Sequence, residues 1–347
     1  LIHFACTSED INNLAYGLML KDMRKKVLLP SLASLRYKLS SLVDDYKNMP
    51  LLARTHGQAA SPTTFGKELS VFAFRFFKQE KELKEMKVLG KINGAVGNYN
   101  AHTFTLPDVD WPQLCKSFVT NKLELEWNPY TTQIESHDYL AKLCQNISLT
   151  STIAIGLCQD IWSYISSDIL GQKYTKNEVG SSTMPHKVNP IDFENAEGNY
   201  GLCRSLANHL AEKLPISRRQ RDLSDSTAQR SLGNLFGHFI LAQDSLLKGL
   251  SKIEAKETTM NQELERHWEV LAEPVQMLLR RYGVTDAYER LKEYTRGQTL
   301  TQEKIREFVA SLTEIPEEEK NRLYELTPAS YIGIAPKLAE EIIKTIN

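Results

Sequence analysis

Hydrophobic positions recur at alternating steps of three and four along most of the chain. The clearest stripe is Leu140, Leu143, Ile147, Thr150, Ala154, Leu157, Ile161 and Tyr164. This spacing places the apolar side chains on one face of an α-helix. Similar stripes predict helices over residues 28–46, 65–86, 140–164, 193–210, 235–253 and 264–282.

The predicted fold class is all-α, a bundle of long helices, because no convincing alternating run of β-branched residues exceeds four or five positions. The stripe over residues 140–164 spans about 35 Å of helix, and helices of that length need extended helical partners. We therefore expect core helices to pack against those of neighbouring subunits. Charge increases from about residue 254, so we expect a central domain over 1–250 and a smaller C-terminal helical domain over 251–347.

Composition narrows the class of protein. The chain has 347 residues, 42 basic and 43 acidic, and a net charge of −1, which gives neither the basic excess of a nucleic-acid binder nor the bias of a disordered chain. It has no membrane-spanning apolar run and no export signal at its start, so we expect a soluble cytoplasmic protein. Five cysteines without a CxxC spacing argue against a disulfide framework or a zinc site, and we expect no metal or cofactor.

Four stretches interrupt the helical pattern, at residues 54–64, 90–132, 171–190 and 214–227. In the first, His56 stands between Thr55 and Gly57, in a segment that cannot be helical before Pro62. Its ring is free to face a cleft, although an isolated loop histidine is more often structural. In the second, residues 90–97 lack both the GxGxxG spacing and a preceding strand, so we reject a dinucleotide or phosphate loop.

The third stretch is a long polar loop that ends in Asn189 and Pro190, with Asp192 following. These residues predict that Asn189 caps the next helix and that Pro190 is its first residue. With Lys187 beside it, the helix start forms an anion site, and Gly180 would allow a lid to close over it. The alternative is a disordered surface loop.

Two further segments have the composition of anion-binding sites. The fourth stretch contains Arg218, Arg219, Arg221 and Arg230 with hydroxyl side chains between them, which suits phosphate or carboxylate recognition. A solvated basic helix face is the alternative. Near the start of the chain, Thr7 and Ser8 are followed by two acids, a pattern that predicts a helix N-terminus.

Residues 180–190 read GSSTMPHKVNP and resemble the signature GSSxMPxKxN of the fumarase/aspartase superfamily at every specified position. Within that superfamily, His186, residues 55–58, residues 7–10 and residues 133–138 resemble the adenylosuccinate lyases, the bacterial type best. Fumarases and aspartases usually carry Gly before the lysine, and argininosuccinate lyases carry Gln. The family normally begins with a further domain that has no counterpart here, so we expect this chain to lack it.

The resemblance implies β-elimination of fumarate from adenylosuccinate, and from the related succinyl-carboxamide ribotide, in purine biosynthesis. It implies Ser181 as general base and His56 as general acid. The substrate-binding residues that it implies are Thr7, Ser8, Gln133, Lys187, Asn189, Asn195, Arg221, Ser226 and Arg230. The supporting residues are Thr55, Ser182, Met184, His137 and His186.

The resemblance also implies a homotetramer with sites shared between subunits, a small-molecule substrate, and neither a nucleic-acid nor a membrane partner. Two alternatives stay open. One is another fumarate-releasing lyase, of the argininosuccinate lyase or fumarase type, against which His186 and the arginines count. The other is a non-catalytic structural bundle, which the presence of Ser181, His56 and Lys187 disfavours.

Overall fold

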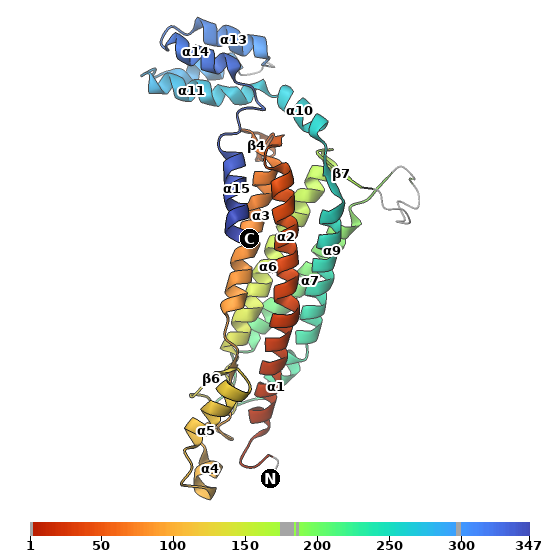
Figure 1. Cartoon of the computed structure of the whole chain (residues 1–347), viewed down its shortest axis with the longest axis vertical. Coiled ribbons are helices and arrows are strands. Elements are labelled where there is room, and N and C mark those ends of the chain that lie inside the picture. Colours follow the sequence, from red (N-terminus) through yellow and green to blue (C-terminus); the bar gives the residue numbers. More distant parts are fainter. Residues whose placement is uncertain (1–2, 174–183, 185–186, 296–299) are drawn as a thin grey trace. The chain divides into compact units, whose positions relative to one another are not determined.

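The computed structural model describes residues 3–173, 184, 187–295 and 300–347, and it divides into two compact units. Unit 1 comprises residues 1–36, 75–162 and 180–251, and unit 2 comprises residues 37–74, 163–179 and 252–347. Three long helices each contribute several residues to both units, and Figure 1 labels them: α2 (Leu29–Tyr46), α3 (Phe65–Glu85) and α6 (Asp138–Ser166).

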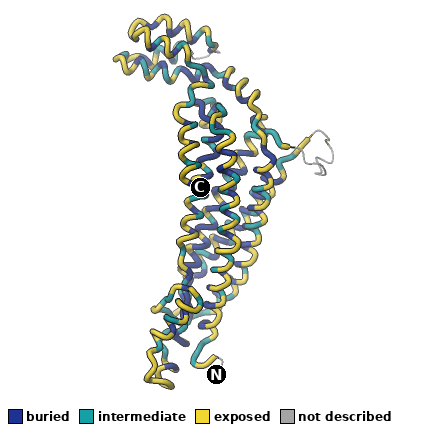
Figure 2. The backbone as a smooth tube through the Cα atoms, viewed as in Figure 1, coloured by how far each residue is buried: buried dark blue, intermediate teal, exposed yellow. Residues whose placement is uncertain are grey.

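Unit 1 contains two further long helices, α7 (Ile191–Lys213) and α9 (Leu232–Lys252). They approach closely, because a Cβ atom added at Gly249 would lie 2.8 Å from the ring of Phe193. The fully buried Tyr200 on α7 donates a hydrogen bond to Gln243 on α9. Each of these helices turns a buried face inward and an exposed face outward, as Figure 2 shows along the tube, so the predicted apolar stripes form the core.

The shorter elements of unit 1 lie before and after these helices. They are α1 (Ser8–Met23), a π-helical turn (Arg24–Leu28), β5 (Leu89–Gly90), α4 (Asn100–Thr105), α5 (Trp111–Ser117), a second π-helical turn (Phe118–Lys122), β6 (Glu126–Trp127) and α8 (Ser224–Gln229). The two strands pair in parallel, with Leu89 opposite Glu126.

Unit 2 contains short helices and three antiparallel strand pairs. The helices are α10 (Glu257–Glu265), a 3₁₀ turn (Trp268–Leu271), α11 (Ala272–Arg281), α12 (Ala287–Thr295), α13 (Gln302–Ser311), α14 (Glu317–Glu325) and α15 (Ala335–Ile346). The strand pairs are β1 (Pro50–Leu51) with β4 (Thr63–Thr64), β2 (Arg54–Thr55) with β3 (Gln58–Ala59), and β7 (Leu170–Gln172) with β8 (Ile253–Ala255). Leu264, Val275, Leu279 and Val309 are buried in its core.

The all-α prediction is confirmed, since no strand in the described part of the chain exceeds three residues. The helices predicted over 28–46, 65–86, 140–164, 193–210 and 235–253 are also confirmed. The expected domain boundary near residue 250 stays a prediction. None of the helices described has the length and apolar character that crossing a membrane requires.

Two local predictions are wrong, and proline is involved in both. Residues 264–282 form the end of α10, a 3₁₀ turn and α11 instead of one helix. Pro274 lacks a backbone N–H, which is tolerated only in the first turn of a helix, and α11 begins two residues before it. Helix α7 begins at Ile191 with Pro190 as its N-cap, because Pro190 (φ −78°, ψ 49°) is not helical. Asn189, the expected N-cap, therefore lies one residue before the observed one.

Candidate functional site

In unit 2, His56 lies at the tip of a β-hairpin. Strands β2 and β3 pair Thr55 with Gln58, which leaves His56 and Gly57 as the two loop residues. Both have positive φ, 53° and 74°, as a type I′ hairpin turn requires. Histidine is among the few side chains that tolerate this conformation. His56 and Thr55 are exposed, so the imidazole is accessible to a ligand.

The segment that carries His56 is anchored to two helices of unit 2. Arg54 forms an ion pair with Glu263 on α10, and its guanidinium donates to the Gly57 carbonyl at 3.5 Å. On the other side of the hairpin, the Ser61 hydroxyl donates to Glu273 on α11. Tyr331 donates to the same carboxylate at 3.1 Å, and burial together with Glu273 raises the pKa of Tyr331 to about 12. These contacts hold the hairpin from both sides.

In unit 1, the predicted helix start at Thr7 is confirmed, and α1 begins at Ser8. The Thr7 N–H donates to the Asp10 carboxylate at 2.8 Å. Asp10 in turn forms an ion pair with Lys91 at 2.8 Å, with both side chains 0 % exposed. The first turn of α1 is therefore fixed by a buried pair whose second member lies in the glycine-containing segment after β5.

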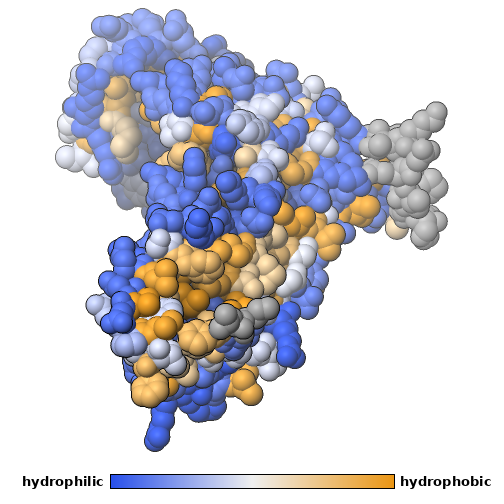
Figure 3. All heavy atoms as spheres, turned by 60° about the horizontal axis from the view of Figure 1, so that its bottom comes forward, coloured by the Kyte–Doolittle hydropathy of each residue, from blue (hydrophilic) through white to orange (hydrophobic). Residues whose placement is uncertain are grey.

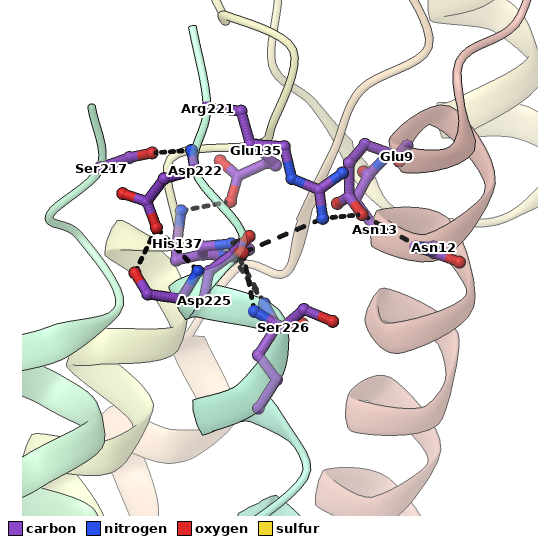
Figure 4. A network of polar contacts seen from close by, with 12 residues as sticks. Glu9, Asn12, Asn13, Glu135, His137, Ser217, Arg221, Asp222, Asp225 and Ser226 are labelled. Carbon is purple, nitrogen blue, oxygen red and sulfur yellow. Dashed lines mark hydrogen bonds and ion pairs between the residues drawn. The ribbon is translucent and has the colours of Figure 1, made fainter. Parts of the chain in front are cut away.

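Arg221 lies between carboxylates from two parts of unit 1 (Figure 4). Its Nη2 lies 3.0 Å from Glu9 on α1 and 3.9 Å from Asp225 on α8. Asp225 also accepts from the Ser226 N–H at 2.7 Å and lies 3.6 Å from Nε2 of His137. Thus Arg221, Ser226 and His137, all predicted from the sequence, meet around one buried carboxylate.

Two opposing effects act on the pKa of Asp225. Burial raises the pKa, but the interactions with His137, the Ser226 N–H and Arg221 together outweigh burial and hold it below the ordinary value. Asp225 is therefore ionised at neutral pH and keeps the guanidinium in place. The guanidinium has five N–H donors, so binding Glu9 and Asp225 through Nη2 leaves donors for an anion.

His137 is held in a strained backbone conformation, with φ of 63°. Its N–H donates to Glu135 at 2.8 Å, and Asn128 donates to the same carboxylate at 2.9 Å. The side chain of Gln229 contacts the His137 ring at 3.1 Å. Non-glycine residues in this region persist only where the surroundings hold them, which is common at functional sites.

The remaining predicted residues of unit 1 lie near the start of α7 or along the chain next to this cluster. Lys187 is exposed and Asn189 half-buried, while the exposed Asn195 accepts a hydrogen bond from Asn199 at 2.7 Å. Met184 is exposed and accepts from the Lys187 N–H at 3.0 Å. Gln133 is half-buried and Arg230 exposed. Ser181, Ser182, His186 and the proposed lid hinge Gly180 lie outside the described residues.

The structure separates two predicted groups within unit 1. Lys187, Asn189 and Asn195 lie at the start of α7, and Arg221 and Ser226 follow its end. Helix α7 has 23 residues. At about 1.5 Å per residue, its two ends are roughly 34 Å apart. One copy of unit 1 therefore does not bring the two groups to one substrate.

Sequence reasoning missed Glu9, Asp225 and Lys91 as parts of this arrangement. The sequence shows Glu9 only as an acid at a helix start, and it does not distinguish Asp225 from the other polar residues near the arginines. Both stand within a few residues of predicted binding residues, so a search for partners of Arg221 could have suggested them. Lys91 has no local signal, because its partner lies in a distant part of the chain.

Known structures and a family model indicate the class of protein to which the chain belongs. The fold resembles that of a fumarate lyase from Mesorhizobium sp. BNC1, with a TM-score of 0.81, 20% identity, and coverage of 99% of this chain and 78% of that chain. A 3-carboxy-cis,cis-muconate lactonizing enzyme from Pseudomonas putida gives a TM-score of 0.80 at 20% identity, covering 99% and 77%. The family model described as Lyase matches residues 1–204, so the class is that of helical-bundle lyases.

More similar relatives define the family. An adenylosuccinate lyase from Vibrio cholerae serotype O1 is 51% identical over 341 residues, covering 98% of this chain and 75% of the relative. Those from Haemophilus influenzae and Escherichia coli K12 are each 52% identical, covering 98% of this chain and 74% of the relative. The model described as Adenylosuccinate lyase C-terminal matches residues 217–332. The chain belongs to the adenylosuccinate lyase family, as its motifs predicted.

Proposed function

We propose that this protein catalyses β-elimination of fumarate from adenylosuccinate, which gives AMP, and from SAICAR, which gives AICAR. The observation that carries the proposal is the 51–52% identity to named adenylosuccinate lyases over 98% of the chain, with the superfamily signature intact. The same identity disfavours a fumarase, an argininosuccinate lyase or a non-catalytic bundle.

The reaction needs a base, an acid and positively charged or hydrogen-bonding groups that stabilise the negative charge on the succinyl carboxylate. Ser181 removes the proton from the carbon next to a succinyl carboxylate, and electrons move to expel the amine as the C–N bond breaks. His56 donates a proton to the departing nitrogen. Support for His56 comes from its position at an exposed, anchored hairpin tip, where its imidazole can reach a ligand.

The substrate has two charged ends, the succinyl carboxylates and the phosphate, and different residues bind each of them. Lys187 and Asn189 hold the succinyl carboxylates together with Thr7 and Ser8 at the start of α1, where free N–H groups favour anions. Gln133 and Asn195 lie near the succinyl group. Arg221, Ser226 and Arg230 bind the phosphate and nucleotide. The Arg230 guanidinium and the Ser226 hydroxyl have no hydrogen-bond partner among the described residues, which leaves both available.

The active form is a homotetramer with sites shared between subunits. Two observations support this. The start of α7 and the Arg221 segment are separated by the whole length of α7, so a second copy is needed to bring their residues together. Exposed apolar side chains on unit 1 include Leu18, Met19, Leu149, Leu202 and Leu241.

Figure 3 shows hydrophobic residues gathered in a large patch in the lower half of the view. In unit 1, a groove of about 570 Å³ lies between α1 and α9, and its apolar walls include Met19, Met23 and Phe236. Patches of this kind on a soluble bundle mark contacts between proteins.

We place the enzyme in the cytoplasm, in keeping with five cysteines that are all free.

Substrate choice tests the proposal. We expect purified protein to turn over adenylosuccinate and to leave argininosuccinate and malate unchanged under the same conditions. The three reactions can be followed in parallel by fumarate formation or consumption. Turnover of argininosuccinate or malate in place of adenylosuccinate would contradict the proposal.

A further inference from the structure

The Asp10 carboxylate gathers an unusual number of donors inside unit 1. Besides Lys91 Nζ at 2.8 Å, it accepts from the backbone N–H groups of Asn93 and Gly94, each at 3.1 Å, and of Thr7 at 2.8 Å. The Lys91 ammonium also donates to the Gly94 carbonyl at 3.1 Å. Both charges are thus paired and hydrogen-bonded, as burial in a protein interior requires.

Asn13 locks the same segment onto α1 from the next helical turn. Its Oδ1 accepts from the Lys91 N–H at 2.9 Å, and its Nδ2 donates to the Lys91 carbonyl at 2.9 Å. The glycines beside Lys91 permit the close approach, since a Cβ at Gly90 would lie 2.7 Å from Leu14. Two turns of α1 are therefore held against residues 90–94.

The buried Asp10–Lys91 ion pair is not well explained by a contribution to the stability of the fold alone. Burial lowers the pKa of Lys91, and the Asp10 carboxylate only opposes that shift, so bringing the ammonium into the interior is costly. Replacing a buried ion pair by apolar residues of similar volume is often neutral or stabilising. What an apolar pair would not reproduce is the bond from Asp10 to the Thr7 N–H, which sets the direction of the peptide before α1.

We propose that Asp10 and Lys91 are positioning residues: they hold the first turn of α1 so that the hydroxyl groups of Thr7 and Ser8 and the Ser8 N–H are presented to a substrate carboxylate, while the Thr7 N–H is bound by Asp10. The inference rests on the proposed function, because it requires a substrate with carboxylates at this helix start. Asp10 and Lys91 do not touch the substrate, since neither side chain is exposed.

The test compares Asp10→Asn, Lys91→Met and the double variant Asp10→Leu/Lys91→Met with a matched control, Arg36→Met. The control removes a different ion pair of unit 1, which is partly buried and joins Arg36 on α2 to Glu80 on α3 at 2.8 Å. Each variant is measured for Tm, for KM and kcat with adenylosuccinate, and for inhibition by fumarate and by AMP.

We expect KM and the inhibition constant of fumarate to rise about tenfold in the Asp10 and Lys91 variants, with kcat and AMP inhibition changed far less. The double variant should regain part of the Tm lost in Lys91→Met, because it no longer buries an unpaired charge, without regaining KM. Arg36→Met should lower Tm and leave KM unchanged. Asp10→Asn is the most conservative change, and it gives a folded protein to measure if Lys91→Met does not fold.

Two results would overturn the inference. One is a double variant that regains KM together with Tm, since the pair would then serve only stability. The other is an unchanged KM and fumarate inhibition in Asp10→Asn. An inactive wild-type protein would instead refute the proposed function, so the two failures are distinguishable.

Discussion

Asp225 is the residue on which the Arg221 cluster depends, because its carboxylate contacts Arg221, the Ser226 N–H and His137. Its pKa lies below the ordinary value of 3.8 although burial raises it. A carboxylate with a lowered folded-state pKa contributes stability that is fully present above the unfolded-state pKa. That stability is lost as the pH falls through the folded-state pKa.

We therefore expect the Tm of the wild-type protein to fall more steeply below about pH 4 than that of Asp225→Asn, which has no proton to bind there. At neutral pH the same variant should be less stable by about 1 to 3 kcal/mol, since the Ser226 N–H, His137 and Arg221 lose a charged partner, although Arg221 keeps its ion pair with Glu9. Thermal melts across pH give both quantities. Asp108→Asn, a change at an exposed carboxylate, should follow the wild-type slope, and an equally flattened slope there would count against the argument.

Removing the proposed acid or base should slow the reaction. Ser181→Ala and His56→Ala should each lower kcat by at least about 10², because each removes one proton transfer from the elimination. The oligomeric state, measured by light scattering, should not change. Near-normal kcat in either variant would refute the role assigned to that residue.

The hairpin of β2 and β3 fixes the position of His56 through its two-residue turn. Gly57 has φ of 74°, and a Cβ added there meets nothing within 4 Å. Gly57→Ala therefore adds backbone strain without a steric clash, at a cost of about 1 kcal/mol. We expect kcat to fall because the His56 ring moves with the turn.

Gly283→Ala provides the control for the hairpin. Gly283 has φ of 83°, equally open surroundings and a place in the turn after α11. Both variants should lose similar stability in denaturant melts, and only Gly57→Ala should lose activity. Equal kcat in the two variants would show that hairpin geometry does not control His56.

The helices and their ends show how much of the fold could be predicted from the sequence. Helices such as α2 and α6 were predicted within two residues, because their apolar periodicity is a local property of the chain. The stripe over 264–282 failed because Pro274 breaks a helix that periodicity alone would continue. The Asp10–Lys91 pair was beyond local reasoning: the neighbouring Asn13–Lys91 contacts already join residues 78 positions apart.

For the whole molecule, the length of α7 is the decisive quantity, since its two ends lie roughly 34 Å apart, with Lys187 and Asn189 before its start and Arg221 after its end. Motif matching identified these residues but not their distance from one another, because a motif contains no tertiary information. The proposed sharing of sites between copies of the chain would reconcile the motif with the structure.

Sharing predicts complementation between inactive variants. Mixed tetramers of Ser181→Ala and Arg221→Ala should regain roughly a quarter of wild-type activity, because random mixing leaves one site in four with both native residues. Mixing Ser181→Ala with Lys187→Ala should restore nothing, since both residues belong to one segment of the same copy. Equal recovery in the two mixtures would contradict shared sites.

Quantifying both products of the reaction distinguishes elimination from any other cleavage of adenylosuccinate. Purified protein is incubated with adenylosuccinate, and AMP and fumarate are separated and quantified over time. The account predicts that both products appear at equal rates, in a one-to-one ratio, with the loss of adenylosuccinate. Adenylosuccinate that stays intact, or that yields AMP without fumarate, would contradict it.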